Sequence, residues 1–339
     1  MRFKFLICLF LASLCLFGVS CKSDLKEKGG GHIHSFITLK TDENYHWREC
    51  DCGEKREKEE HQYYEFKCSC GLEITPEELT LEKSVDGTYY TVTACEATCE
   101  MILIPKQHEQ IPIKKIGDGA FKNLTALKKV VTSVGLETIG NEAFFGCENL
   151  STLLLAETVT LIGKSAFENS YSLEKINLPN GLTEIKERAF ANCKSIKTFE
   201  INKNLTQIGE QAFIGCNKIT EFIVDKRNEN FESKSGNLYT KDIKGLIYFA
   251  NGKTRTAFSV PTSVEKIYDY AFYGNENLTT LYFSKNLKEI GYKAIYIANL
   301  QTINYTGDRQ SFEKIDFDGE WLSSKKTVTV YPSGEAFVI

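Results

Sequence analysis

From residue 116 onward, apolar residues recur at an interval of 23 residues. The first position of each repeat is isoleucine, at Ile116, Ile139, Ile162, Ile185, Ile208, Ile267 and Ile290. Alanine stands four residues later in all seven copies, and six copies continue with phenylalanine, at Phe121, Phe144, Phe167, Phe190, Phe213 and Phe272. Self-similarity at a period of this length predicts a solenoid in which each repeat is one coil.

Each coil combines two local patterns. Ile176 and Leu178 alternate with polar neighbours, as do Phe199 and Ile201 in the next coil, which predicts a short strand with one buried face. The Ala-Phe segment lacks this alternation, and we expect a tight helical or 3₁₀ turn there. One coil cannot bury its own apolar columns, so stacked coils with parallel strands should bury one another's.

The step from Ile208 to Ile267 is longer than one coil. It contains two β-rich runs, 237–240 and 246–250, separated by a polar link, so we expect a hairpin coil over 225–260 that interrupts the stack. The expected organisation of the second part of the chain is an N-terminal cap at 79–115, the solenoid at 116–305 and a C-terminal cap at 306–339.

The repeat resembles a known bacterial pattern. The consensus of the BspA-like leucine-rich repeat family of microbial surface proteins is matched in one coil by Ile162-Gly163, Ala166-Phe167, Leu173, Ile176, Leu178-Pro179 and Leu182. The resemblance covers about residues 79–320 and departs from the consensus where Lys186 and Tyr268 replace glycine. It implies a leucine-rich-repeat solenoid and adhesion to extracellular or host-surface proteins.

One residue of each predicted strand lies between two buried residues and should point outward. We call this set the outer column; its members are Val131, Leu154, Asn177, Glu200, Ile223, Tyr282 and Asn304. Several members are apolar, which β-propensity alone would explain. The functional interpretation is a stripe that binds proteins or glycans.

The N-terminus predicts export. Arg2 and Lys4 precede an apolar run from Leu6 to Val19, which is typical of a signal peptide at 1–20 and too short for a membrane span of about 20 residues. Gly18-Val19-Ser20-Cys21 resembles a bacterial lipobox, which implies lipidation of Cys21 and attachment to a membrane through the lipid. Ordinary cleavage after Ser20 is the alternative. A polar tether follows at 21–31.

A small Cys/His module should precede the solenoid, at 32–71. Its candidate metal ligands are His34, His46, Cys50, Cys52, His61, Cys68 and Cys70. Thiolates and imidazoles are typical zinc ligands, whereas two disulfides would suit an exported protein equally well. A structural zinc is therefore the one cofactor considered, and a metal-handling lipoprotein with the repeats as scaffold is the alternative function.

Charge and composition narrow the functional classes. With 41 Lys and Arg against 45 Asp and Glu, the net charge of −4 argues against a nucleic-acid partner. All five histidines lie at or before His108, and no nucleophile-elbow, phosphate-loop or zinc-protease motif is present, so we expect no enzymatic activity. Cys147, Cys193 and Cys216 share one repeat column and are expected to be buried free thiols rather than a bridge.

Overall fold

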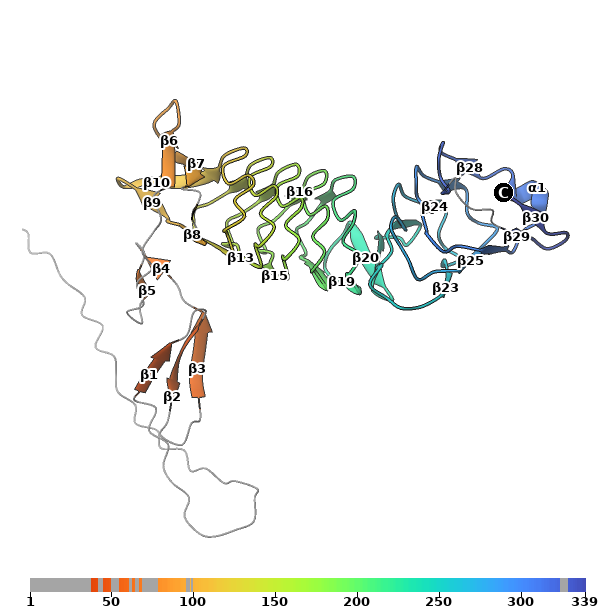
Figure 1. The fold of residues 1–339 in the computed structure, drawn as a ribbon, viewed down its shortest axis with the longest axis horizontal. Coiled ribbons are helices and arrows are strands. Elements are labelled where there is room, and N and C mark those ends of the chain that lie inside the picture. The colour runs from red at the N-terminus through yellow and green to blue at the C-terminus, as the bar shows by residue number, and fades with distance from the viewer. Residues whose placement is uncertain are drawn as a thin grey trace, which may run out of the picture. The chain divides into compact units, whose positions relative to one another are not determined.

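The computed structural model describes residues 38–41, 45–49, 55–60, 63–64, 67–68, 79–95, 98, 100–323 and 329–339. The chain divides into two compact units, Met1–Glu73 and Ile74–Ile339 (Figure 1). Among the described residues the one α-helix is α1 (Arg309–Phe312), which Asp308 caps. No helix in this part of the chain is long and apolar enough to cross a membrane.

The described part of the first unit consists of short antiparallel strands. The strands β1 (Thr38–Thr41), β2 (Tyr45–Glu49) and β3 (Lys55–Glu60) form one sheet, and β4 (Tyr63–Tyr64) pairs with β5 (Lys67–Cys68). Of the candidate zinc ligands, His46 lies in β2 and Cys68 in β5. The other five, and Cys21, lie outside the described residues. Among the residues that are described, no group of His, Cys, Asp and Glu side chains could hold a metal.

The second unit begins with a stack of coils that carries two parallel ladders of strands (Figure 1). One ladder follows the isoleucine column through β7 (Tyr90–Cys95), β10 (Ile111–Ile116), β12 (Thr138–Ile139), β14 (Leu161–Ile162), β16 (Glu184–Ile185) and β18 (Gln207–Ile208). The other comprises β8 (Met101–Ile104), β11 (Lys129–Thr132), β13 (Thr152–Leu154) and β15 (Lys175–Asn177), followed by the pair β17 (Thr198–Ile201) and β19 (Glu221–Val224). The strand β6 (Leu79–Lys83) covers β7 in antiparallel pairing, and β9 (Gln107–His108) pairs with β10.

A hairpin coil then leads into a second stack. Its strands β20 (Phe231–Lys234), β21 (Asn237–Thr240) and β22 (Gly245–Tyr248) pair antiparallel in sequence order. From β22 the first ladder continues through β24 (Lys266–Ile267), β26 (Glu289–Ile290) and β28 (Asp316–Phe317). The second ladder consists of β23 (Ala257–Ser259), β25 (Thr280–Phe283), β27 (Thr302–Tyr305), β29 (Thr329–Tyr331) and β30 (Phe337–Val338).

The Ala-Phe segments are not helical, so the expectation of tight helical turns was wrong. The residue before each repeat alanine has positive φ; these residues are Gly119, Glu142, Ser165, Arg188, Gln211, Tyr270 and Lys293. A left-handed residue in every coil prevents a right-handed helix from continuing. The N–H of Ala120 bonds the carbonyl of Gly117 in its own coil, whereas the N–H of Phe121 bonds that of Ala143 in the next coil, at 2.8 Å. Each segment is therefore a series of β-turns that adds a third hydrogen-bonded ladder between coils.

The repeat phenylalanines form a continuous stack inside the first group of coils. The ring of Phe144 lies 5.0 Å from that of Phe121 and 5.1 Å from that of Phe167, and Phe190 follows at 5.4 Å from Phe167. The side chains of Phe144, Phe167 and Phe190 are fully buried. A single coil would expose these rings, so each coil is stabilised mainly by its neighbours.

Two apolar cores meet at the hairpin coil. One extends from Tyr90 to Ala250 and the other from Tyr239 to Val330. The two buried strands of the hairpin serve both: Leu238 and Tyr248 pack in the first core, whereas Tyr239 and Leu246 pack in the second. The hairpin is thus the wall between the two stacks.

The cysteine column consists of free thiols, as expected. The Sγ atoms of Cys147, Cys193 and Cys216 each donate to a phenylalanine carbonyl of the preceding coil, at 3.0–3.2 Å. Ser170 donates from the same column to the carbonyl of Phe144. In the cap, Cys95 is disulfide-bonded.

We expect these three thiols to resist alkylation in the native protein. Burial raises the pKa of Cys147 and Cys216 from 9.0 to about 12, and raises that of Cys193 well above its ordinary value. The reactive thiolate is therefore suppressed in the native state. An unfolded thiol loses its proton near pH 9 while the native one keeps it, so the free energy of unfolding should fall as pH rises above about 9. Iodoacetamide labelling with peptide mapping, with and without urea, measures the protection; rapid labelling of all three without urea would contradict it.

Candidate functional site

The outer column is divided among three separate ladders. Val131, Leu154 and Asn177 are in register in the first, and Glu200 and Ile223 in the second. In the third, Tyr282 pairs with Asn304. The column therefore exists as register positions, but it does not form one unbroken row.

Exposure differs strongly within the outer column. Ile223 and Tyr282 are each 43% exposed, whereas Val131, Leu154 and Asn304 are half-buried and Glu200 is exposed. The side-chain amide of Asn177 is occupied, because its Oδ1 accepts the N–H of Leu155 at 2.7 Å and its Nδ2 donates to the carbonyl of Leu155. The apolar part of the column that a partner could touch is therefore centred on Ile223 and Tyr282.

One residue in register with the outer column was not anticipated. Tyr331 of β29 lies beside Asn304 and is 49% exposed. The sequence places it in the C-terminal cap, where no Ile-Ala-Phe signature fixes the register. Tyr331 adds a third exposed apolar side chain to those of Ile223 and Tyr282.

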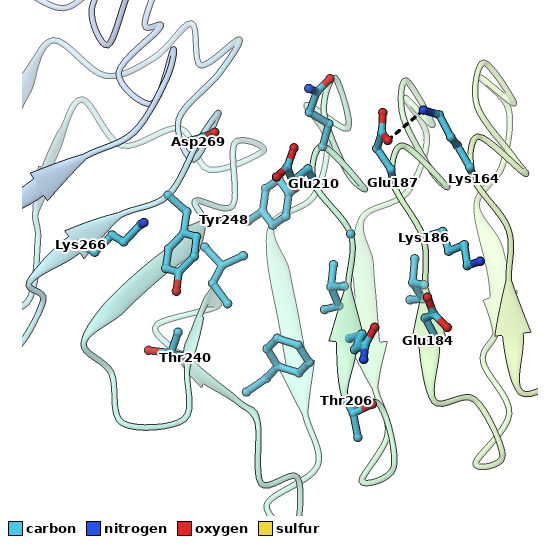
Figure 2. Close-up of a pocket in the computed structure, with 18 residues that line it drawn as sticks. Lys164, Glu184, Lys186, Glu187, Thr206, Glu210, Thr240, Tyr248, Lys266 and Asp269 are labelled. Atoms are coloured by element: carbon cyan, nitrogen blue, oxygen red, sulfur yellow. Dashed lines mark hydrogen bonds and ion pairs between the residues drawn. The ribbon is translucent and has the colours of Figure 1, made fainter. Parts of the chain in front are cut away.

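A groove lies on the other ladder, where the first stack meets the hairpin coil (Figure 2). The strand that follows β18 at the 23-residue interval is β20, in which Phe231 stands 23 residues after Ile208. Among the described strands, β20 pairs with β21 and not with β18. Within this part of the chain β18 therefore pairs with β16 alone, and a groove of about 730 Å³ lies beside it.

The free edge of β18 presents unpaired backbone groups. In the coil before it, the carbonyls of Thr183 and Ile185 accept N–H groups from Thr206 and Gly209, at 2.9 and 2.7 Å. Within the described chain, the corresponding carbonyls of Thr206 and Ile208 accept no hydrogen bond. The hydroxyl of Thr206 donates backwards, to the carbonyl of Thr183. The edge that faces the groove therefore retains its capacity to pair with another strand.

The groove wall is apolar in its middle. Ile208 and Ile247 are half-buried, and Tyr268 is 37% exposed. Phe231 and Tyr248 are buried behind them. These side chains come from both stacks and from the hairpin, so the wall exists only in the folded junction.

The charged rim of the groove is mixed but acidic on balance. Lys164 pairs with Glu187 at 2.9 Å, as the dashed line in Figure 2 marks, and Lys266 pairs with Glu289 at 2.5 Å. In the part of the chain that the structure describes, no ion pair involves the other rim charges, which are Lys186 against Glu184, Glu210 and Asp269. A visiting segment would therefore meet more negative than positive charge.

The repeat identifies the family. The BspA type leucine-rich repeat region matches residues 114–236 and 245–327, in six copies. The chain belongs to the BspA-type leucine-rich repeat family. The residues between the two matched ranges, 237–244, contain β21 and its link to β22. The strand β21, which pairs with β20 on one side and β22 on the other, is thus the part of the hairpin coil that departs from the family repeat.

A solved structure shares the fold. That of the pneumococcal vaccine antigen PcpA aligns with a TM-score of 0.53 and 22% identity, over 79% of this chain and 72% of that one. A leucine-rich cell surface protein from Faecalibacterium prausnitzii gives 0.46 at 18% identity, over 83% and 98%. A leucine-rich repeat protein of T. pallidum gives 0.47 at 20% identity, over 73% and 97%. A comparison with curated proteins gives no match.

Proposed function

We propose that this BspA-type protein is exported, is anchored to a membrane by lipid on Cys21, and binds extracellular or host-surface proteins without catalysing a reaction. The observation that carries the proposal is the set of three exposed apolar side chains Ile223, Tyr282 and Tyr331, at register positions where a surface strand is usually polar. Aromatic side chains exposed on a rigid sheet are favourable anchors for a protein partner.

Lipidation follows from the lipobox-like segment that ends at Cys21. We expect the mature chain to begin at Cys21 and to carry acyl groups on it. A mass spectrum of the N-terminal peptide from membrane-fraction protein measures this. An unmodified N-terminus at Cys21, in protein recovered only from the medium, would show a freely secreted protein instead.

Binding through the outer column is tested by removing its apolar groups. We expect the triple variant Ile223→Ser, Tyr282→Ser and Tyr331→Ser to bind immobilised extracellular-matrix proteins roughly tenfold or more weakly than wild type, because truncation of an interface anchor costs over about 1 kcal/mol. Surface plasmon resonance with the full-length protein measures the change.

A matched control removes exposed apolar groups elsewhere. Val85 and Val134 are 110% and 59% exposed and lie outside the outer column. Their double serine variant should bind as wild type does. Equal weakening by the outer-column variant and by this control, or by neither, would remove the outer column from the binding surface. Stabilisation of residues 32–71 by a bound zinc ion or by disulfides stays a prediction.

A further inference from the structure

We propose that the groove beside β18 binds an extended, basic peptide segment of a partner protein, which adds a strand to the free edge of β18. The inference rests on the proposed protein-binding function and specifies the chemistry that the partner presents. It concerns a surface distinct from the outer column, which lies on the other strand ladder.

The free edge of β18 carries backbone groups that another strand could bond. Solenoid and sheet proteins normally cover or pair their edges, as β6 covers β7 and β30 covers β29 in this chain. Among the described strands none covers the edge of β18, because the next strand, β20, pairs with β21 instead. The sequence of β18, Gln207–Ile208, contains neither a proline nor a charge that would discourage pairing. An extended chain supplies N–H and C=O groups at the spacing that the Thr206 and Ile208 carbonyls require.

The groove also has room and apolar contacts for such a segment. Its volume is about 730 Å³, and Ile208, Ile247 and Tyr268 line it with partly exposed apolar surface. In strand addition the main chain supplies affinity and pockets for alternate side chains supply specificity. An incoming strand can therefore place one set of side chains against these residues and the alternate set toward the charged rim.

The charges on the rim of the groove indicate that the bound segment is positively charged. Three rim carboxylates without an ion-pair partner in the described residues face one such ammonium group, on Lys186. Of the three, Asp269 already accepts the N–H of Tyr292 at 3.0 Å, whereas within the described residues the carboxylates of Glu184 and Glu210 accept no hydrogen bond. Lysine or arginine side chains on the segment would complement Glu184 and Glu210, and an acidic segment would be repelled.

The test uses the full-length protein and a synthetic probe, the N-acetylated and C-amidated heptapeptide of alternating arginine and valine. Fluorescence anisotropy measures its binding, and hydrogen exchange measures protection of the peptide segment that contains Ile208. We expect binding with slowed exchange around Ile208. Methylation of alternate backbone nitrogens in the probe keeps its charge but removes donors, and should weaken binding roughly tenfold or more. The counterpart with glutamate for arginine should not bind.

Protein variants locate the site. The double variant Glu184→Gln and Glu210→Gln should bind the probe roughly 5- to 30-fold more weakly at low salt, since each exposed ion pair contributes up to about 1 kcal/mol. Glu148→Gln with Glu276→Gln makes the same change in net charge at exposed carboxylates outside the groove, and should bind as wild type does. If both double variants bound the probe equally more weakly than wild type, the probe would be held by non-specific charge attraction, and the proposal would be overturned.

The outcomes separate this inference from the proposed function. The outer-column serine variant should keep full affinity for the probe while losing matrix-protein binding. Probe binding that is unaffected by N-methylation, or that leaves exchange around Ile208 unchanged, would overturn strand addition even if matrix-protein binding through the outer column is observed. If the wild-type protein binds the probe but binds no matrix protein, the groove proposal stands and the function proposed for the outer column is wrong.

Discussion

Replacing Phe144 with alanine should lower the free energy of unfolding by about 3–5 kcal/mol, the usual cost of truncating a buried aromatic residue. The ring is fully buried between Phe121 and Phe167, at 5.0 and 5.1 Å between centroids. Its removal leaves a cavity within a stack of rings from at least four successive coils, and hydrogen-bonded ladders on several sides prevent the coils from closing over it. Urea denaturation followed by circular dichroism measures the loss.

Phe145 provides the matched control for this experiment. It is the next residue, but it is only half-buried, and the Lys122 ammonium lies 5.0 Å from its ring. We expect Phe145→Ala to cost about 1 kcal/mol, as is typical of substitutions outside the core. If the two alanine variants lost the same stability, the phenylalanine stack would not be the main source of coil cohesion.

The sequence was sufficient for the parts of the fold that repeat. Within the first stack, successive repeat isoleucines pair in register and successive phenylalanine rings stack, so one local environment recurs and leaves a visible column. Ile139, Ala143 and Phe144 are all fully buried, as their columns predict. The family and the stacked parallel strands follow from those columns alone.

The turns could not be predicted because the positive φ that defines them is not accompanied by a recurring residue type in the sequence. The left-handed position before each repeat alanine holds glycine once, at Gly119; elsewhere it holds Glu, Ser, Arg, Gln, Tyr or Lys. Without a glycine column there is nothing to indicate positive φ. The two-residue strands of the isoleucine ladder, such as β12, are likewise too short to show alternation.

The groove could not be predicted because it depends on which strand takes which edge. The two β-rich runs at 237–240 and 246–250 indicated a hairpin, and β21 and β22 do pair. Nothing in the sequence shows that β20, which follows β18 at the repeat interval, pairs with β21 and not with β18. The consequence, a strand edge of β18 without a partner among the described strands, is a property of tertiary topology.

Removing the ring of Tyr248 should separate the unfolding of the two stacks. Tyr248 is 7% exposed and closes the first core, with its ring 5.3 Å from that of Phe213 and 6.3 Å from that of Phe222. Its hydroxyl accepts the N–H of Phe213. In earlier coils the N–H of the corresponding phenylalanine donates instead to the alanine carbonyl of the next coil, as Phe190 does to Ala212. Tyr248→Ala should therefore destabilise the first core by about 3–5 kcal/mol. The second core lies on the other face of the hairpin and retains its contacts.

Two optical probes distinguish the stacks in a Trp47→Phe background, in which Trp321 is the remaining tryptophan. Trp321 packs against the second core, 4.5 Å from the ring of Phe317, so its fluorescence reports that stack, whereas circular dichroism reports both. With Tyr248 present we expect coincident urea transitions; with Tyr248→Ala the circular dichroism should change first. Tyr296→Ala removes a half-buried ring that stacks on Tyr273, within the second stack, and should leave the transitions coincident. Coincident transitions in Tyr248→Ala would mean that backbone pairing through the hairpin, rather than this ring, couples the two cores.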